Sequence, residues 1–246
     1  MNVYIYDDFL NKSRYRRTLG KIEIRLTDLG LNGKIIRLGS IKNVKDLIQA
    51  ELKNGVKNFT AVGNNNTVIK VVSALVSNKA YDFFQKEILF SIIPIGENNS
   101  IANSLGIKKG QESCNIILAR RIKTVDLAWA GTTVFLGKAE LKTNYAEIEI
   151  DEKYKIEIEK NINAQILNIS DIKNLINIDR INPNDKKLNI SINKGKDTTY
   201  IASNNIQIHG SGELLLDTSL VESLPVKLGI LKQKLNIVVG KTRNFH

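Results

Sequence analysis

The chain has 246 residues, of which 42% are hydrophobic and 25% are charged, so it can bury one large core or two smaller ones and is not globally disordered. Its single cysteine, Cys114, excludes an intramolecular disulfide and favours a reducing compartment. Thirty-six Lys and Arg against 25 Asp and Glu give a formal charge of +11, which attracts polyanions and anionic membrane surfaces. The basic residues are scattered, so they indicate either solvated faces or a functional basic surface.

Neither the start of the chain nor its hydropathy indicates export. Asp7 and Asp8 stand where a secretory leader needs a basic end followed by an apolar run. The longest apolar stretch, 88–95, is far below the ~20 residues of a membrane-spanning helix and contains Pro94. The sequence predicts a cytoplasmic protein that contacts an anionic membrane, if at all, peripherally.

The first half alternates buried strands with helices. We expect strands at 3–6, 34–39, 58–63 and 88–96, and helices at 41–54, at 67–76 and just before 105–106. This order is typical of a parallel sheet covered by helices. It predicts an amino-terminal α/β domain over residues 1–123.

After about Lys123 the hydrophobic period becomes two. Alternating strands are predicted at 146–151, 154–160, 164–169, 187–193, 198–203, 205–210, 213–217 and 234–240. Their spacing by Gly, Asn and Ser turns is typical of an antiparallel sandwich or open barrel. We therefore expect a second, antiparallel β domain over 124–246, whose exposed sheet edge could pair in a homodimer.

Two polar loops, at 61–72 and 93–107, each follow a predicted strand and precede a helix. Ligands of α/β proteins bind at such positions, and the free backbone N–H groups favour phosphate. The alternative is that Thr67 and Ser100 are simply helix N-caps.

Taken together, the two loops resemble the diacylglycerol kinase catalytic domain of bacterial lipid kinases and sphingosine kinases. That family carries G-G-D-G-T in the first loop, of which Gly63 and Thr67 match the ends. It carries P-x-G-T-x-N-D-x-A-x-x-L-G-I in the second, matched here by Pro94, Gly96, Asn99, Ala102, Leu105, Gly106 and Ile107. The resemblance continues over 117–127 and 182–239, where Asp185 takes an acidic place in a D-D-G-x-L turn and Asp217 begins the D-G-E position.

The resemblance implies a NAD kinase-like fold and ATP- and Mg²⁺-dependent phosphorylation of a lipid hydroxyl between the two domains. Asp217 would be the general base, and Asp185 would contribute to the metal site. The alternative for Asp217 is a strand-end carboxylate that stabilises a turn. The nucleotide would be bound by Gly63, Asn64, Asn65, Asn66, Thr67, Gly96, Glu97, Asn98 and Asn99.

Several phosphate- and metal-contacting positions depart from the family pattern. Asn65 replaces the Asp of the first loop and Ser100 replaces the Asp of the second, although Mg²⁺ prefers anionic oxygens. The D-G-E position reads Asp217-Thr218-Ser219, and 4–11 replaces the family's N-P-x-S-G segment. A second hypothesis follows, in which the chain is a catalytically inactive relative that binds a lipid, a nucleotide or a protein partner.

Other chemistries lack their signatures. His209, His246 and Cys114 do not have zinc-ligand spacing, and no P-loop, Rossmann or serine-hydrolase pattern occurs. Only the net charge favours a nucleic acid, without a recognisable module, so we expect no nucleic-acid partner.

Overall fold

The computed structural model describes residues 1–39, 43–169, 182–195 and 197–245. Its internal contacts divide the chain into two units. The first unit comprises Met1–Val125 and Gln233–Arg243, and the second comprises Asp126–Lys232 and the residues from Asn244. Part of the helix predicted at 41–54 falls on residues 40–42, which lie outside the described residues.

The first unit contains a parallel sheet, as the alternation of strands and helices predicts. Neighbouring strands are paired in the order β14-β4-β3-β1-β2, and every pair is parallel. The strands are β1 (Asn2–Tyr6), β2 (Gly33–Arg37), β3 (Asn58–Gly63), β4 (Leu89–Pro94) and the final part of β14 (Val226–Val238).

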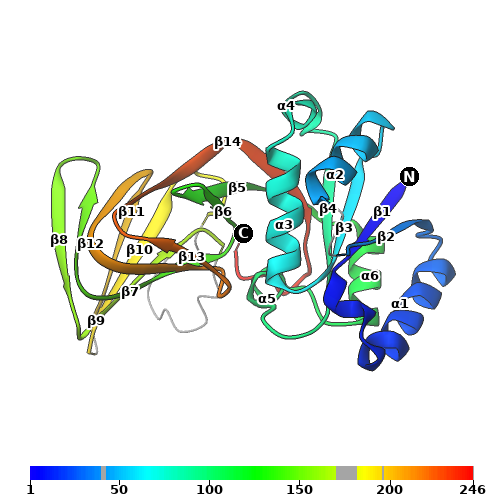
Figure 1. The fold of residues 1–246 in the computed structure, drawn as a ribbon, viewed down its shortest axis with the longest axis horizontal. Coiled ribbons are helices and arrows are strands. Elements are labelled where there is room, and N and C mark those ends of the chain that lie inside the picture. Colours follow the sequence, from blue (N-terminus) through cyan, green and yellow to red (C-terminus); the bar gives the residue numbers. More distant parts are fainter. Residues whose placement is uncertain (40–42, 170–181, 196, 246) are drawn as a thin grey trace. The chain divides into compact units, whose positions relative to one another are not determined.

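Helices cover both faces of this sheet (Figure 1). They are α1 (Arg16–Asp28), α2 (Val44–Lys53), α3 (Asn65–Val76), α4 (Lys79–Phe84), α5 (Ser100–Ser104) and α6 (Gln111–Ala119), with 3-10 turns η1 (Asp8–Asn11) and η2 (Ser13–Tyr15). In α1, Leu19, Ile22 and Leu26 form one buried stripe against the β1 side chains. Within the described residues, no helix has the length and apolar character that crossing a bilayer requires.

The last strand returns to the first unit, an arrangement that the sequence analysis does not anticipate. Asn236 and Ile237 of β14 pair with Leu89 and Phe90 of β4. Just beyond this strand, the Gly240 N–H donates to the Leu105 carbonyl at 2.8 Å. A Cβ at position 240 would lie 1.8 Å from the Gly106 oxygen, so this approach requires glycine.

The second unit is built from antiparallel pairs, as the period-two pattern predicts. Its path runs β11-β10-β9-β7-β12-β14, with β8 beside β7, β13 beside β12, and β5 paired with β6. The strands are β5 (Ile122–Ala130), β6 (Thr133–Phe135), β7 (Lys138–Ile150), β8 (Tyr154–Glu159), β9 (Ile162–Leu167), β10 (Leu188–Lys194), β11 (Asp197–Ser203), β12 (Asn205–Leu216), β13 (Leu220–Ser223) and the first part of β14.

One prediction in this unit is wrong in detail. The strands expected at 205–210 and 213–217 form one strand, β12, that ends at Leu216. The register against β7 shifts between Ser211 and Glu213, so a β-bulge interrupts the alternation without ending the strand.

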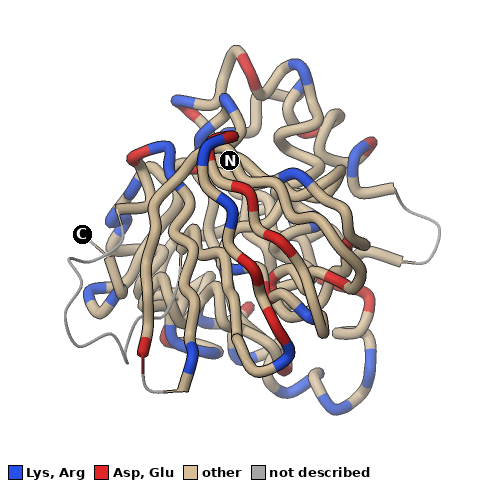
Figure 2. The backbone as a smooth tube through the Cα atoms, turned by 90° about the vertical axis from the view of Figure 1, so that its left-hand side faces the viewer, with Lys and Arg blue, Asp and Glu red and all other residues tan. Residues whose placement is uncertain are grey.

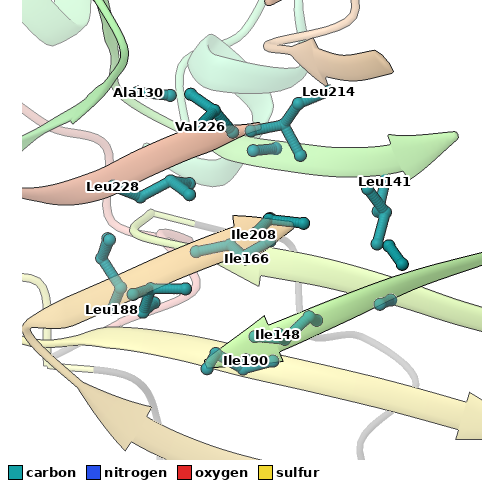
Figure 3. Packing of buried hydrophobic residues seen from close by; sticks show 14 of the residues in the cluster. Ala130, Leu141, Ile148, Ile166, Leu188, Ile190, Ile208, Leu214, Val226 and Leu228 are labelled. Atoms are coloured by element: carbon teal, nitrogen blue, oxygen red, sulfur yellow. The ribbon is translucent and has the colours of Figure 1, made fainter. Parts of the chain in front are cut away.

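Alternate residues of the strands fill the core of the second unit (Figure 3). Ile148 of β7 and Ile208 of β12 occupy facing register positions, and Ile190 of β10 pairs with Ile166 of β9. All four side chains are buried. The core is therefore made from every second residue of these strands, as the predicted period of two requires.

We predict that Gly240→Ala destabilises the protein by about 2 kcal/mol or more, because the added methyl group meets backbone that must shift. Urea unfolding provides the measurement. The matched control is Gly20→Ala, in α1, where nothing lies within 4 Å of the new methyl. That variant should gain about 0.5–1 kcal/mol from helix propensity. Equal stability of the two variants would contradict the proposed tight approach.

Candidate functional site

The two polar loops lie side by side in the first unit, as expected for the ends of adjacent parallel strands. Gly63 at the end of β3 pairs with Pro94 at the end of β4. The Ile95 N–H donates to the Gly63 carbonyl, and the Asn65 N–H donates to the Asn98 carbonyl, both at 2.9 Å. The structure thus brings together the positions that the family resemblance assigns to the nucleotide.

The first loop forms a closed helix cap. Asn64 is the N-cap of α3, and its side chain and that of Thr67 bond each other's backbone N–H groups in a capping box. Gly63 has φ +156°, and a Cβ there would lie 2.1 Å from the Thr67 hydroxyl oxygen. The alternative that Thr67 and Ser100 are themselves N-caps is wrong, because Asn64 and Asn99 hold those positions.

Asn65 and Ser100, which replace the two acidic residues of the family, are bonded to each other. The buried Asn65 amide donates from Nδ2 to the Ser100 hydroxyl at 2.8 Å, and its Oδ1 accepts the Ile101 N–H at 3.3 Å. Two carboxylates at such a separation would repel each other by several kcal/mol unless a cation lay between them. The amide and hydroxyl remove both that repulsion and the anionic oxygens that Mg²⁺ prefers.

Asp7 adds a negative charge to the first loop, and the sequence analysis did not identify it as a site residue. Asp7 is buried, with only 6% of its surface exposed. Oδ2 accepts the Thr67 hydroxyl at 2.8 Å and lies 3.7 Å from the Lys70 ammonium. Because Thr67 lies in the first turn of α3, this carboxylate complements the positive end of the helix. Its position directly after β1, the neighbour of β3, is the signal that could have identified it.

Aromatic residues cover the second loop. Phe9 and Tyr15 pack edge to face, with their ring centroids 5.4 Å apart. Gly96 has φ +83°, and a Cβ there would lie 3.2 Å from the Phe9 ring. The buried Asn99 fixes this turn by donating from Nδ2 to the Gly96 carbonyl at 2.9 Å. Of the other residues expected to bind nucleotide, Glu97 and Asn98 are exposed and Asn66 is half-buried.

Asp217 lies in the second unit, where its carboxylate is fully buried. Oδ2 accepts the Leu136 N–H at 2.7 Å, and Oδ1 accepts the N–H groups of Gly137 and Lys138 at 2.8 and 2.9 Å. Burial raises the pKa of Asp217 to about 6, although the three N–H donors oppose the shift. These contacts favour the turn-stabilising alternative, while the general-base role stays a prediction.

Asp185 also lies in the second unit, on an exposed turn. Its carboxylate accepts the Lys187 N–H at 2.9 Å. The next residue along the chain, Lys186, donates its backbone N–H to the carboxylate of the buried Asp126 at 2.7 Å. The acidic turn is thus held by backbone hydrogen bonds, and the metal role of Asp185 stays a prediction.

Metal-ligand side chains converge elsewhere in the second unit. Among the described residues, Glu147, Glu149 and His209 form one such group, because their possible ligand atoms all lie within 4.8 Å of one another. Lys155 already lies 2.8 Å from Glu147 and 3.8 Å from Glu149. Figure 2 shows acidic and basic residues interleaved along the strands of this unit, so the group is part of an ion-pair network.

We predict that Asp217→Asn lowers the free energy of unfolding by about 2 kcal/mol or more, since an amide cannot accept all three N–H groups and turns its own donor toward them. Urea denaturation measures the loss. Asp185→Asn, on the exposed turn, is the control and should change stability by less than about 0.5 kcal/mol. Unchanged stability of Asp217→Asn would show that the three bonds do not hold this turn.

Comparisons with known proteins agree with this arrangement. The model of the diacylglycerol kinase catalytic domain matches residues 3–130. A diacylglycerol kinase from Bacillus anthracis str. Sterne has the same fold, with a TM-score of 0.76 over 98% of each chain and 17% sequence identity. A second structure from that organism, assigned provisionally to the same class, gives a TM-score of 0.76 at 16% identity over 98% of each chain.

The search of curated proteins gave no match. At 16–17% identity the solved structures establish the fold alone. The family model, in contrast, covers just over half of the chain, including both polar loops. This protein therefore belongs to the diacylglycerol kinase catalytic-domain family.

Proposed function

We propose that this chain is a catalytically inactive member of the family, which keeps the lipid-kinase fold without transferring phosphate. The observation that carries the proposal is the hydrogen bond between Asn65 and Ser100. Phosphoryl transfer depends almost entirely on positioning and on neutralising the phosphate charge, for which kinases use metal ions and cationic side chains. A neutral amide and hydroxyl replace the acidic pair at this point.

The residues of the two loops do not fit Mg²⁺ and ATP. Asn65 and Ser100 satisfy each other, so neither needs a cation. The capping box of Asn64 and Thr67 uses N–H groups that a phosphate would bind. The carboxylate of Asp7 then places a like charge beside any phosphate in the first loop.

A second candidate is the active ATP-dependent lipid kinase that the family membership suggests. One observation favours it: a pKa of about 6 for Asp217 is near the value that a general base needs at neutral pH. For this role, the Asp217 carboxylate would have to exchange its backbone donors for the substrate hydroxyl.

Calorimetric titration with ATP and Mg²⁺, against a magnesium-only blank, separates the two candidates. We expect no saturable binding to the wild-type protein, because the loops lack the acidic pair. The Asn65→Asp, Asn66→Gly variant restores part of the family loop and should raise the affinity. Saturable binding by the wild type, followed by phosphate transfer to extracted lipids, would establish the active kinase instead.

We also predict that Asp7→Asn binds free ATP, titrated without metal, at least about tenfold more tightly than the affinity limit set by the wild-type titration. The amide keeps an acceptor for Thr67 but removes a charge, and a like charge beside a phosphate costs on the order of several kcal/mol at an effective dielectric of about 20. Asp8→Asn is the matched control. It removes the same charge one residue away, but from an exposed side chain. Equal affinities of the two variants would exclude Asp7 as the residue that repels phosphate.

A further inference from the structure

Glu147 and Glu149 of β7 and His209 of β12 lie on one face of the sheet in the second unit. Ile148 and Ile208, which alternate with them along the strands, belong to the core, so the three side chains lie on the outer face. Glu147 and His209 are register partners, and the two glutamates are two residues apart. Because β7 is paired with both β12 and β8, its backbone holds these side chains together before any ligand binds.

The possible ligand atoms of these side chains have separations that suit a metal ion. His209 Nε2 lies 3.3 Å from Oε2 of Glu149, and ligand atoms of all three residues lie within 4.8 Å of one another. With metal–ligand bonds of about 2.1 Å, two ligands of a tetrahedral zinc ion lie about 3.4 Å apart. The imidazole and Glu149 already have this separation, and Glu147 can reach it by rotating its side chain.

The charges at neighbouring positions of this face favour a cation. On β8, Glu157 is the register partner of Glu147, and Lys155 is the register partner of Glu149. Three carboxylates thus stand against one ammonium group. The next lysine, Lys227, lies two strands from Glu149, about 10 Å away and beyond the Debye length at physiological salt. The excess negative charge attracts a divalent cation.

Lys155 already places a cationic group beside the two glutamates of β7. Its ammonium lies 2.8 Å from Glu147 and 3.8 Å from Glu149. The Lys155 side chain is 61% exposed, and exposed ion pairs contribute little to stability. A metal ion can therefore displace this ammonium group and bind the same carboxylate oxygens.

We propose that Glu147, Glu149 and His209 bind a divalent transition metal ion such as Zn²⁺. One imidazole with two carboxylates suits zinc and related first-row metals, whereas Mg²⁺ and Ca²⁺ prefer oxygen ligands alone. Three protein ligands leave the fourth position of a tetrahedral ion to water. The ion joins β7 to β12 within the second unit, so this proposal does not rest on the proposed function.

The test is calorimetric titration of the full, metal-free chain with Zn²⁺, repeated with Mg²⁺. We expect saturable binding of one Zn²⁺ per chain and no saturable binding of Mg²⁺ at this site. Thermal unfolding provides a second measurement. Zn²⁺ should raise the melting temperature, because a ligand of the folded state stabilises that state.

His209→Ala and Glu149→Gln should each weaken Zn²⁺ binding at least about tenfold, because each removes a ligand. Lys155→Met should instead strengthen it about threefold, because the competing ammonium group is gone. The matched control is His246→Ala, which removes the only other histidine of the chain and should bind Zn²⁺ like the wild type.

Three results would overturn the proposal. One is that the wild type shows no saturable Zn²⁺ binding up to about 1 mM, or binds Mg²⁺ as tightly as Zn²⁺. Another is that His246→Ala loses as much affinity as His209→Ala. The third is that Lys155→Met fails to strengthen binding. Circular dichroism melts without metal confirm that each variant is folded.

Discussion

The hydrogen bond between Asn65 and Ser100 determines what the two loops can do. Adjacent parallel strands bring these residues to one edge of the sheet, where the family pattern has a carboxylate on each loop. Two carboxylates there need a cation, whereas an amide and a hydroxyl need only each other. A neutral side-chain contact thus joins the loops, beside their two backbone hydrogen bonds, at the place where the family pattern has two carboxylates.

Buried carboxylates satisfy hydrogen-bond donors at the amino-terminal end of α3 and in one turn of the second unit. Asp7 supplies the helix N-terminus with an anion from the chain itself, and Asp217 supplies one to three backbone N–H groups. Each carboxylate is buried and has its donors within the same unit. Both carboxylates are therefore internal parts of the fold, because burial makes their hydrogen-bond donors indispensable.

The sequence predicted much of this fold because its signals are local. Period two in the second half and strand-helix alternation in the first depend on neighbouring residues, and both describe the observed sheets. Three features depend on distant residues and were missed: the return of β14 beside β4, the continuity of β12 through its bulge, and the contact of Asp7 with Thr67. Loss of the carboxylates at Asn65 and Ser100 was visible in the sequence, but the bond between these two residues became visible only through the pairing of β3 with β4.

The position of α4 has a consequence for any ligand of the loops. A 12-residue helix such as α3 rises about 18 Å, and the loops lie at its first turn while α4 follows its last. This separation exceeds the Debye length of about 8 Å at physiological salt, so the charges of a ligand in the loops are largely screened from α4.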